Sequence, residues 1–254
     1  MFIITGGGSG IGRALALSLV ERGKKVLIIG RREQLLRETV AFGGANINYL
    51  QADVASTEGL NTIKNHLNNV SHIDALINNA GTLQPLVTLH DVPADEWQNA
   101  LNTNLNAALY LPQMLYEKLT LGRVLNIGSG AAYFAMKGWG AYCVTKAALA
   151  MLTKCWQLES KSVAFASVMP GIIDTHMQEL ARSHENPDDD KSNFYQRLKE
   201  HGRLISPDIV ALFLTWLLLD VDTSTFISKE WDIYDNKHHS SWLKPPHQVL
   251  HWDF

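Results

Sequence analysis

Thr5-Gly6-Gly7-Gly8-Ser9-Gly10-Ile11-Gly12 is the stretch of sequence that decides the fold. It follows a short apolar run and opens a helix-like segment. Glycines permit a tight turn and a close approach of the backbone to a ligand, and the first N–H groups of a helix attract a pyrophosphate. The spacing of the glycines departs from the usual G-x-G-x-x-G, so alone the loop could be an ordinary glycine-rich turn. Its place directly after a strand favours a dinucleotide site.

Short apolar runs alternate with longer helix-like segments along the rest of the chain. The expected strands are Phe2–Thr5, Lys25–Gly30, Ile47–Gln51, Ile73–Asn78, Gly122–Ile127, Val163–Met169 and Thr225–Ile233. The expected helices are Ile11–Arg22, Arg32–Ala41, Glu58–Leu67, Ala94–Leu119, Gly140–Ser160 and Pro207–Leu219. Most of the strand runs are apolar throughout, which fits strands covered on both faces. The sequence therefore predicts an α/β protein with a doubly wound Rossmann fold, a mainly parallel seven-stranded sheet flanked by helices.

The composition is typical of one globular domain. The chain has 254 residues, 46% of them hydrophobic, which suffices to bury a full core in a single domain spanning residues 1–254. Its formal net charge of −3 offers no basic surface for nucleic acid or an anionic membrane. No apolar run reaches the roughly 18 residues of a membrane span. The early glycine loop leaves no room for a signal peptide.

The two cysteines indicate a reducing compartment. Cys143 and Cys155 fall in one expected helix, 12 positions apart. That spacing separates them by ~18 Å, far beyond the ~7 Å limit for a disulfide. Because unbridged thiols are typical of reducing compartments, we expect a cytoplasmic location.

A polar insertion follows the sixth expected strand, from about residue 176 to 203. It contains Asn186-Pro187-Asp188-Asp189-Asp190 and a short amphipathic piece, Phe194–Leu198. Insertions of this length after the carboxyl end of a strand are typically functional or mobile. We expect a substrate-binding lobe that makes few buried contacts and closes as a lid.

The C-terminal tail, residues 236–254, is rich in tryptophan and histidine. Large apolar side chains at a chain end either dock or become an association liability. We expect the tail to pack on its own last strand or, preferably, across a two-fold axis onto a second subunit. Pro245-Pro246 would stiffen it as an extended segment.

The end of the second expected strand bears on cofactor choice. It reads Leu27-Ile28-Ile29-Gly30-Arg31-Arg32. A site for NAD would place an acidic side chain here for the 2′-hydroxyl of the ribose. Gly30 stands there instead, and the guanidinium groups of Arg31 and Arg32 can pair with a 2′-phosphate. The alternative is a solvated helix start, although basic residues are not especially favoured at that end. We expect NADP(H) as the cofactor.

Three residues in the middle of the chain form the strongest chemical signal. Ser129 ends the fifth expected strand, Tyr142 follows thirteen residues later, and Lys146 lies four beyond it. Positions i and i+4 share one face of a helix, so the phenol and the ammonium can point at one site. Asn104 would lie on the neighbouring helix. An isolated Tyr-x-x-x-Lys is usually a surface feature. A purely structural role does not explain why all of these residues occur in this order beside a glycine-rich turn.

With these residues in place, the chain resembles the short-chain dehydrogenase/reductase family in its compact form. The resemblance covers roughly residues 1–235. The resemblance rests on Thr5–Gly12, Asp53-Val54, Asn78-Asn79-Ala80-Gly81, Asn104, Ser129, Tyr142, Lys146 and Pro170-Gly171 followed by Thr175. The sequence departs from the family pattern near its C-terminal end, where many members have a glycine-rich turn after the last strand.

The resemblance implies a role for each of these positions. It implies a catalytic group of Ser129, Tyr142, Lys146 and Asn104, with Asn104 holding a water that links Lys146 to solvent. It also implies that Asp53 and Val54 contact the adenine and that Thr175 approaches the nicotinamide carboxamide. The complete expected cofactor site is Gly6, Ser9, Gly10, Ile11, Gly12, Arg31, Arg32, Asp53, Val54, Asn79, Ala80, Gly81, Tyr142, Lys146, Pro170, Gly171, Ile173 and Thr175.

Reaction chemistry independently favours these roles. Hydride transfer to a ketone develops negative charge on oxygen, which needs an acid and a polar cradle. Tyr142 would donate the proton and Ser129 would hydrogen-bond the carbonyl oxygen. The ordinary pKa of tyrosine is ~10. We expect Lys146 and an oxidised nicotinamide to lower it, since general acids work best near the operating pH.

The leading hypothesis is an NADPH-dependent carbonyl reductase acting on a small or medium-sized ketone or aldehyde. One alternative is an NADP-dependent alcohol dehydrogenase working in the oxidative direction. The other is a non-catalytic NADP(H)-sensing regulatory protein, which would not need a proton donor. Epimerases and dehydratases of the extended branch need a longer chain for a sugar-nucleotide domain.

Substrate, metal and assembly are less clearly marked. We expect Ala131, Trp139 and Ile172 to line the substrate pocket. His247 and His251 are four positions apart, but no carboxylate or cysteine partner is evident, so we expect no metal. The expected partners are the carbonyl substrate and further copies of the chain, in a homodimer or homotetramer.

Overall fold

The chain winds around a parallel β-sheet, as predicted. The computed structural model describes residues 1–183 and 190–252. In these residues the sheet has seven strands in the order β3-β2-β1-β4-β5-β6-β7, and all neighbouring pairs are parallel. The strands are β1 (Phe2–Thr5), β2 (Val26–Gly30), β3 (Ile47–Gln51), β4 (Ala75–Asn78), β5 (Arg123–Ile127), β6 (Ala164–Met169) and β7 (Trp231–Asp232).

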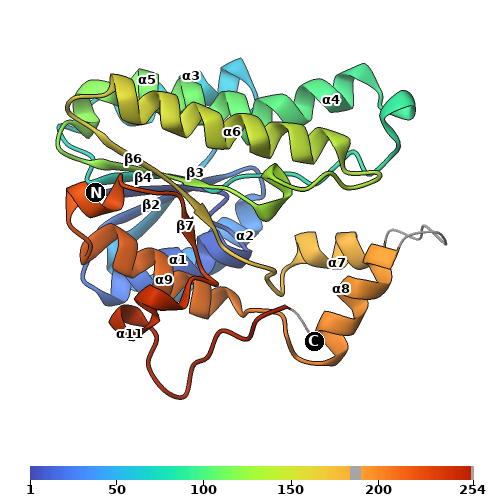
Figure 1. The fold of residues 1–254 in the computed structure, drawn as a ribbon. Coiled ribbons are helices and arrows are strands. Elements are labelled where there is room, and N and C mark those ends of the chain that lie inside the picture. The colour runs from blue at the N-terminus through green and yellow to red at the C-terminus, as the bar shows by residue number, and fades with distance from the viewer. Residues whose placement is uncertain (184–189, 253–254) are drawn as a thin grey trace.

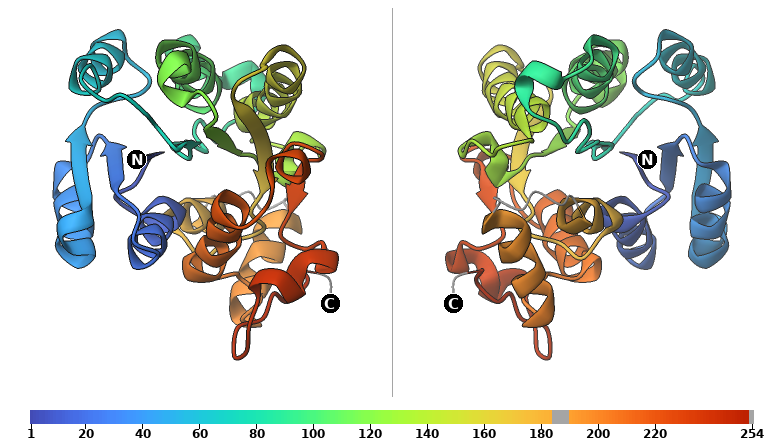
Figure 2. Two further views of the ribbon diagram at one scale, coloured as in Figure 1. Left: turned by 90° about the vertical axis from the view of Figure 1, so that its left-hand side faces the viewer. Right: turned by 90° about the vertical axis from the view of Figure 1, so that its right-hand side faces the viewer.

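Helices cover both faces of the sheet (Figures 1 and 2). One face carries α1 (Gly10–Glu21), α2 (Glu33–Gly43) and α9 (Pro207–Leu219). The other carries α3 (Thr57–His66), α4 (Ala94–Leu101), α5 (Ala107–Leu115) and α6 (Gly140–Glu159). The remaining helices are α7 (His176–Ser183), α8 (Asp190–Glu200), α10 (Thr223–Phe226) and α11 (His239–Trp242).

Alternate residues of each strand enter two separate cores. Ile4 packs with Leu15 of α1 and Phe213 of α9, whereas its neighbour Ile3 packs with Leu111 of α5 on the opposite face. All five side chains are fully buried. Successive side chains of a strand point to opposite faces, so a strand covered twice must be apolar at every position. This explains why the strands read as unbroken apolar runs.

The strand order reverses between β1 and β4, and this reversal determines where a ligand can enter. The chain leaves β1 toward β2 on one side and later returns to place β4 on the other. The loops after β1 and β4 therefore diverge and leave a crevice at the carboxyl ends of the strands. In doubly wound sheets this crevice is the usual ligand site.

Two predicted elements differ from the structure. The expected helix 94–119 is interrupted by a π-helical turn at Asn102–Asn106 and ends in a 3₁₀ turn, Tyr116–Leu119. The expected strand 225–233 is wrong over most of its length. Residues Thr223–Phe226 form α10, because the Asp222 side chain caps its N-terminus by accepting a hydrogen bond from the Thr225 N–H.

The insertion between β6 and α9 forms α7 and α8, a lobe beside the carboxyl edge of the sheet (Figure 1). The expectation of few buried contacts is wrong here, because Leu198 is fully buried and Gln178 and Ala181 are also buried. A β-bridge between Ile173 and Ile205 joins the two ends of the lobe. Of the acidic run noted in the sequence, residues 186–189 lie outside the described residues.

The tail packs on its own chain, the first of the two expected alternatives. Trp242 is buried, with its ring 5.0 Å from that of Phe213 on α9. The main partner of Trp242 is thus α9 rather than the last strand. Pro245 and Pro246 form a turn, so the expectation of an extended segment is wrong. From this turn the tail runs back toward α8 (Figure 1).

Candidate active site

The glycine loop between β1 and α1 is shaped by contacts that leave no room for side chains. Gly6 and Gly10 have φ of +69° and +52°, a left-handed conformation that favours glycine. A Cβ at Gly12 would lie 2.4 Å from the carbonyl oxygen of Gly6. The first turn of α1 carries no acidic residue, and the Ser9 side chain does not cap it. Its N–H groups and dipole can therefore receive an anion.

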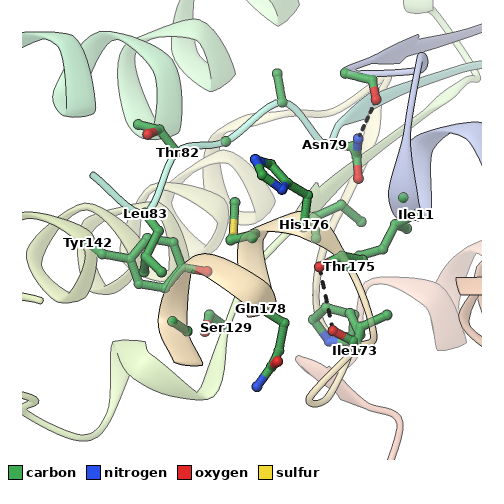
Figure 3. A pocket seen from close by; sticks show the side chains of 18 of the residues that line it. Ile11, Asn79, Thr82, Leu83, Ser129, Tyr142, Ile173, Thr175, His176 and Gln178 are labelled. Carbon is green, nitrogen blue, oxygen red and sulfur yellow. Dashed lines mark hydrogen bonds between the residues drawn. The ribbon is translucent and has the colours of Figure 1, made fainter. Parts of the chain in front are cut away.

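Hydrogen bonds tie the loop after β4 to the end of β1. The Thr5 hydroxyl accepts hydrogen bonds from the backbone N–H groups of Asn79 and Ala80, both at 3.0 Å. The Asn79 amide donates to the Thr5 carbonyl at 2.8 Å. Figure 3 shows Asn79 at the edge of the cavity near Ile11. The two sides of the crevice are thereby held at a fixed separation.

The two arginines after β2 lie at the same end of the cavity. The Arg32 guanidinium donates to the Ser9 hydroxyl at 3.1 Å. Arg31 lies 3.7 Å from the Asp53 carboxylate and keeps 62% of its side chain exposed. Because exposed ion pairs contribute little, this pairing leaves the Arg31 charge accessible to a competing anion.

Ser129, Tyr142 and Lys146 meet at the opposite end of the cavity. Tyr142 and Lys146 project from the first turns of α6 and are buried. Lys146 donates through Nζ to the Ile127 carbonyl at 2.7 Å, and its Nζ lies 5.6 Å from the centroid of the Tyr142 ring. Figure 3 shows the Tyr142 hydroxyl facing Ser129. The helical i, i+4 spacing predicted for this pair thus does bring both groups to one site.

Burial shifts the pKa of both titrating groups. It lowers the pKa of Lys146 to about 8, because the ammonium is taken out of water. Burial also raises the pKa of Tyr142, while its hydrogen bond with Ser129 acts in the opposite direction. The expectation that the protein's own groups lower the pKa of Tyr142 is therefore wrong, because burial has the largest effect and raises it. These groups keep the phenol protonated and ready to donate.

Asn104 lies in the π-helical turn between α4 and α5 and is buried. Its side-chain oxygen accepts from the Thr82 N–H at 2.8 Å, and its amide donates to the Thr82 carbonyl and the Thr145 hydroxyl at 2.9 and 3.0 Å. The side chain thus joins the loop after β4 to α6 beside the tyrosine. Asn104 does not itself line the cavity, and its hydrogen bonds do not include Lys146, which donates to Ile127.

Aromatic residues enclose the space in front of Tyr142. The Trp139 ring stands edge-on to Tyr142 at 5.9 Å and stacks on Tyr195 of α8 at 5.7 Å. Trp139, predicted as a pocket residue, does line the cavity together with Ala131 and Ile172. Sequence reasoning missed Leu83, Tyr234 and Trp252, which line it as well. The density of aromatic residues in the tail was the available signal for the last of these.

A carboxylate absent from the predicted set anchors the segment after Ser129. Glu230 accepts hydrogen bonds from the Tyr133 hydroxyl and, at 2.8 Å, from the Ser167 hydroxyl of β6. Burial and this carboxylate raise the pKa of Tyr133 to about 12. Glu230 directly precedes β7, and its hydrogen bonds couple the start of the last strand to the pocket wall.

A single cavity of about 1520 Å³ connects these parts. Twenty-one of the predicted site residues line it, and two do not. The exceptions are Asn104 and Gly12, which packs against Gly6. Tyr142 and Lys146, which were predicted both as catalytic and as cofactor-binding residues, are counted once each. The predicted residues that line the cavity are Gly6, Ser9, Gly10, Ile11, Arg31, Arg32, Asp53, Val54, Asn79, Ala80, Gly81, Ser129, Ala131, Trp139, Tyr142, Lys146, Pro170, Gly171, Ile172, Ile173 and Thr175.

Comparison with known proteins assigns the family. The model of the short chain dehydrogenase family matches residues 1–186. The chain belongs to the short-chain dehydrogenase/reductase family. It is 35% identical over 234 residues to a benzil reductase ((S)-benzoin forming) of Bacillus cereus, covering 85% of this chain and 92% of that protein. It is 34% identical over 233 residues to a Bacillus subtilis protein of the same name, covering 86% and 93%.

A solved structure shows the same fold. The short-chain dehydrogenase/reductase from Saccharomyces cerevisiae superposes with a TM-score of 0.86 at 24% identity, covering 96% of this chain and 99% of that one. Family membership makes the protein an oxidoreductase that acts on CH–OH or C=O groups with a nicotinamide cofactor. No helix in residues 1–183 and 190–252 is long and apolar enough to cross a membrane. No cluster of metal-binding side chains occurs in that part of the chain.

Proposed function

We propose that the protein is an NADPH-dependent carbonyl reductase whose substrates carry aromatic rings next to the reducible carbonyl. The observation that carries the proposal is a single cavity with the glycine loop at one end and Ser129, Tyr142 and Lys146 at the other. A dinucleotide lying along this cavity would have its pyrophosphate at α1 and its nicotinamide near the tyrosine.

The residues at the pyrophosphate end fit such a cofactor. Gly6 and Gly10 leave the backbone open to a ligand, and α1 offers N–H groups without a competing acid. Beyond them, Gly30 at the end of β2 leaves the ribose position without a carboxylate. Arg31 and Arg32 bring two positive charges there, which supports a 2′-phosphate and hence NADP(H).

In the proposed reaction NADPH, when bound, supplies the hydride. Tyr142 donates its phenolic proton to the carbonyl oxygen, so that hydride and proton together convert the ketone to an alcohol. Ser129 hydrogen-bonds the same oxygen and stabilises the developing charge. Lys146 sits close enough to stabilise the phenolate left on Tyr142. The Trp139 ring keeps water away from this side of Tyr142.

The substrate class follows from the pocket wall and from the relatives. Trp139, Tyr195 and Phe194 present aromatic surface to the cavity, which favours apolar rings over sugars or charged acids. The names of the two Bacillus proteins specify benzil, a 1,2-diketone with a phenyl ring on each carbonyl. We therefore place diaryl 1,2-diketones first among the substrates to be tested.

The test is consumption of NADPH by purified protein with benzil, acetophenone and butane-2,3-dione. We expect the highest kcat/KM with benzil and a product in which one carbonyl is reduced. Tyr142→Phe removes the proton donor and should lower kcat by ~10² or more, with NADPH binding nearly unchanged. NADPH binding without turnover of any carbonyl would contradict the proposal and favour a sensor. A variant retaining more than about a tenth of the activity would exclude Tyr142 as the acid.

We also propose a homodimer or homotetramer in the cytoplasm. The outer faces of α5 and α6 expose Tyr110, Val144 and Met151, and exposed apolar side chains that gather on one face favour association. Cys143 and Cys155 are free, which suits a reducing compartment. Sedimentation equilibrium should give a mass at least twice that of the chain; a monomer would contradict the assembly.

A further inference from the structure

A row of aromatic rings leads from Tyr142 to the C-terminal tail. Trp139 lies 5.9 Å from Tyr142 and 5.7 Å from Tyr195. Tyr195 lies 5.4 Å from its neighbour Phe194. The Phe194 ring in turn stands edge-on to Trp252 at 6.3 Å. Each separation falls within the range in which aromatic rings attract one another. Three segments far apart in the sequence thus supply one continuous wall.

The tail is held in place at this wall by contacts that do not involve Trp252. Arg203 donates to the His251 carbonyl at 3.0 Å. The His251 ring meets Tyr234 edge-on at 5.2 Å, and the Tyr234 hydroxyl accepts from the Ile172 N–H at 3.1 Å. The tail is therefore linked to the loop after β6, which lines the same cavity. Trp252 also stacks on the His251 ring at 5.1 Å, but the hydrogen bond from Arg203 and the ring contact with Tyr234 are not made by the Trp252 side chain.

Trp252 itself has an unusual environment for a tryptophan. It lines the cavity and 43% of its surface stays exposed, whereas Trp242, in the same tail, is buried. Packing alone does not require a large apolar ring in this position. A half-exposed ring at a cavity wall can instead receive a flat apolar group of a ligand.

We propose that Phe194 and Trp252 form a subsite for a second aromatic ring of the substrate. The inference rests on the proposed function: one ring lies near Trp139 while its carbonyl faces Tyr142, and the other ring lies against the tail. Trp252 then determines specificity between diaryl and monoaryl ketones and takes no part in the chemistry. In diaryl and monoaryl substrates alike, the carbonyl that is reduced is the one bonded to the first ring, near Trp139.

Two substrates that share the first ring and the 1,2-dicarbonyl separate this role from catalysis. Benzil carries a second phenyl ring, whereas 1-phenylpropane-1,2-dione carries a methyl group in its place. For Trp252→Ala we expect KM for benzil to rise about tenfold with kcat little changed, since a lost ring contact is worth about that much. KM for 1-phenylpropane-1,2-dione should change by less than about twofold. Trp252→Phe keeps an aromatic ring and should restore most of the benzil affinity.

Binding provides a readout that does not depend on turnover. Titration calorimetry of benzil into the NADP⁺-loaded protein should show the same tenfold weakening for Trp252→Ala and its recovery in Trp252→Phe. An equal loss for both diketones would assign Trp252 a structural role and overturn the inference, and so would no loss for either. If wild type turns over neither diketone, the proposed function fails, and the binding experiment still decides whether the subsite exists.

Discussion

The glycine loop and the C-terminal tail line one cavity, but they are held in different ways. The loop is shaped by backbone contacts within a few residues, such as the close approach of Gly12 to Gly6, and by Asn79 on the adjoining strand end. The tail is held by side chains distant in sequence, Phe213 for Trp242 and Arg203 for His251. The glycine loop depends on residues that have no side chain, whereas the tail depends on large aromatic side chains.

This difference bears on how each part can change. A backbone turn that only glycine can adopt tolerates almost no substitution, which suits a cofactor that does not vary. A wall of aromatic side chains can exchange one ring for another without changing the backbone. We infer that substrate choice resides in the lobe and the tail, whereas cofactor choice resides in a few residues after β2.

Trp242→Ala tests how firmly the tail is docked and should have the largest effect on stability. The ring is buried against α9 and its Nε1 donates to His238 at 2.9 Å. Removing it should lower the free energy of unfolding by about 3–5 kcal/mol, as for other buried tryptophans. Urea denaturation followed by circular dichroism measures this loss. Deleting everything after Lys237 should destabilise the protein at least as much and weaken the proposed oligomer.

Trp252→Ala is the matched control for that experiment, with the same side chain removed from the same tail. Because Trp252 is 43% exposed, we expect a loss of less than about 1.5 kcal/mol. If both substitutions lowered the free energy of unfolding equally, the tail would be docked equally firmly at Trp242 and at Trp252. No loss at either position would show the tail to be a loose appendage.

Cofactor choice should respond to two substitutions at the end of β2. Wild type should bind NADPH at least tenfold more tightly than NADH, a difference of ~1.4 kcal/mol. Gly30→Asp combined with Arg31→Ile should reverse this preference, since the carboxylate would repel a 2′-phosphate. A Cβ at Gly30 would lie 3.4 Å from the nearest atom, Leu36 Cδ2, so the aspartate fits. Titration calorimetry with both cofactors gives the ratio.

Arg37→Ile is the control for the loss of positive charge. Arg37 lies on the same helix α2 but pairs with Glu33 at 2.8 Å. The ratio of NADPH to NADH affinity should stay as in wild type. A wild type that binds both cofactors equally would show that the arginines do not read the phosphate. The residues after β2 would then not determine which cofactor the protein prefers.

The sequence predicted the cofactor half well because its signals are local. A glycine-rich turn between a strand and a helix, or a Tyr-x-x-x-Lys pair on a helix, can be recognised without knowing what packs against it. The structure places Gly10, Ser129 and Tyr142 on one cavity, as the order of the motifs indicated. Of these three residues, Tyr142 is tested directly by the Tyr142→Phe variant.

The substrate half was harder because its contacts join distant segments. Nothing near Glu230 in the sequence shows that it accepts hydrogen bonds from Tyr133 and Ser167. The polar composition of residues 176–203 suggested an open lobe, yet Leu198 is fully buried. Composition reports the average polarity of a segment, whereas a single apolar side chain at the right register is enough to dock a helix.

His238 provides the smallest effect and connects the tail to pH. Its ring is buried between Trp216 and Phe213, at 5.5 and 4.9 Å. The Trp242 N–H donates to its Nδ1, so the other ring nitrogen, Nε2, carries the proton and donates to the Asp232 carbonyl at 2.9 Å. A second proton would have to occupy Nδ1 and would break the bond from Trp242, a net loss of ~1 kcal/mol.

Burial accordingly lowers the pKa of His238 below its ordinary 6.5, although the Asp232 carbonyl and the nearby Asp235 carboxylate act in the opposite direction. The unfolded chain then binds a proton at a higher pH than the folded protein does. The stabilisation is complete above pH 6.5 and is lost as the pH falls from there through the folded-state pKa. His238→Gln keeps a donor for Asp232 but cannot titrate. Urea denaturation at about pH 8 and about pH 5.5 should show wild type losing more stability than this variant. Equal losses would mean that His238 contributes nothing to the pH dependence of stability.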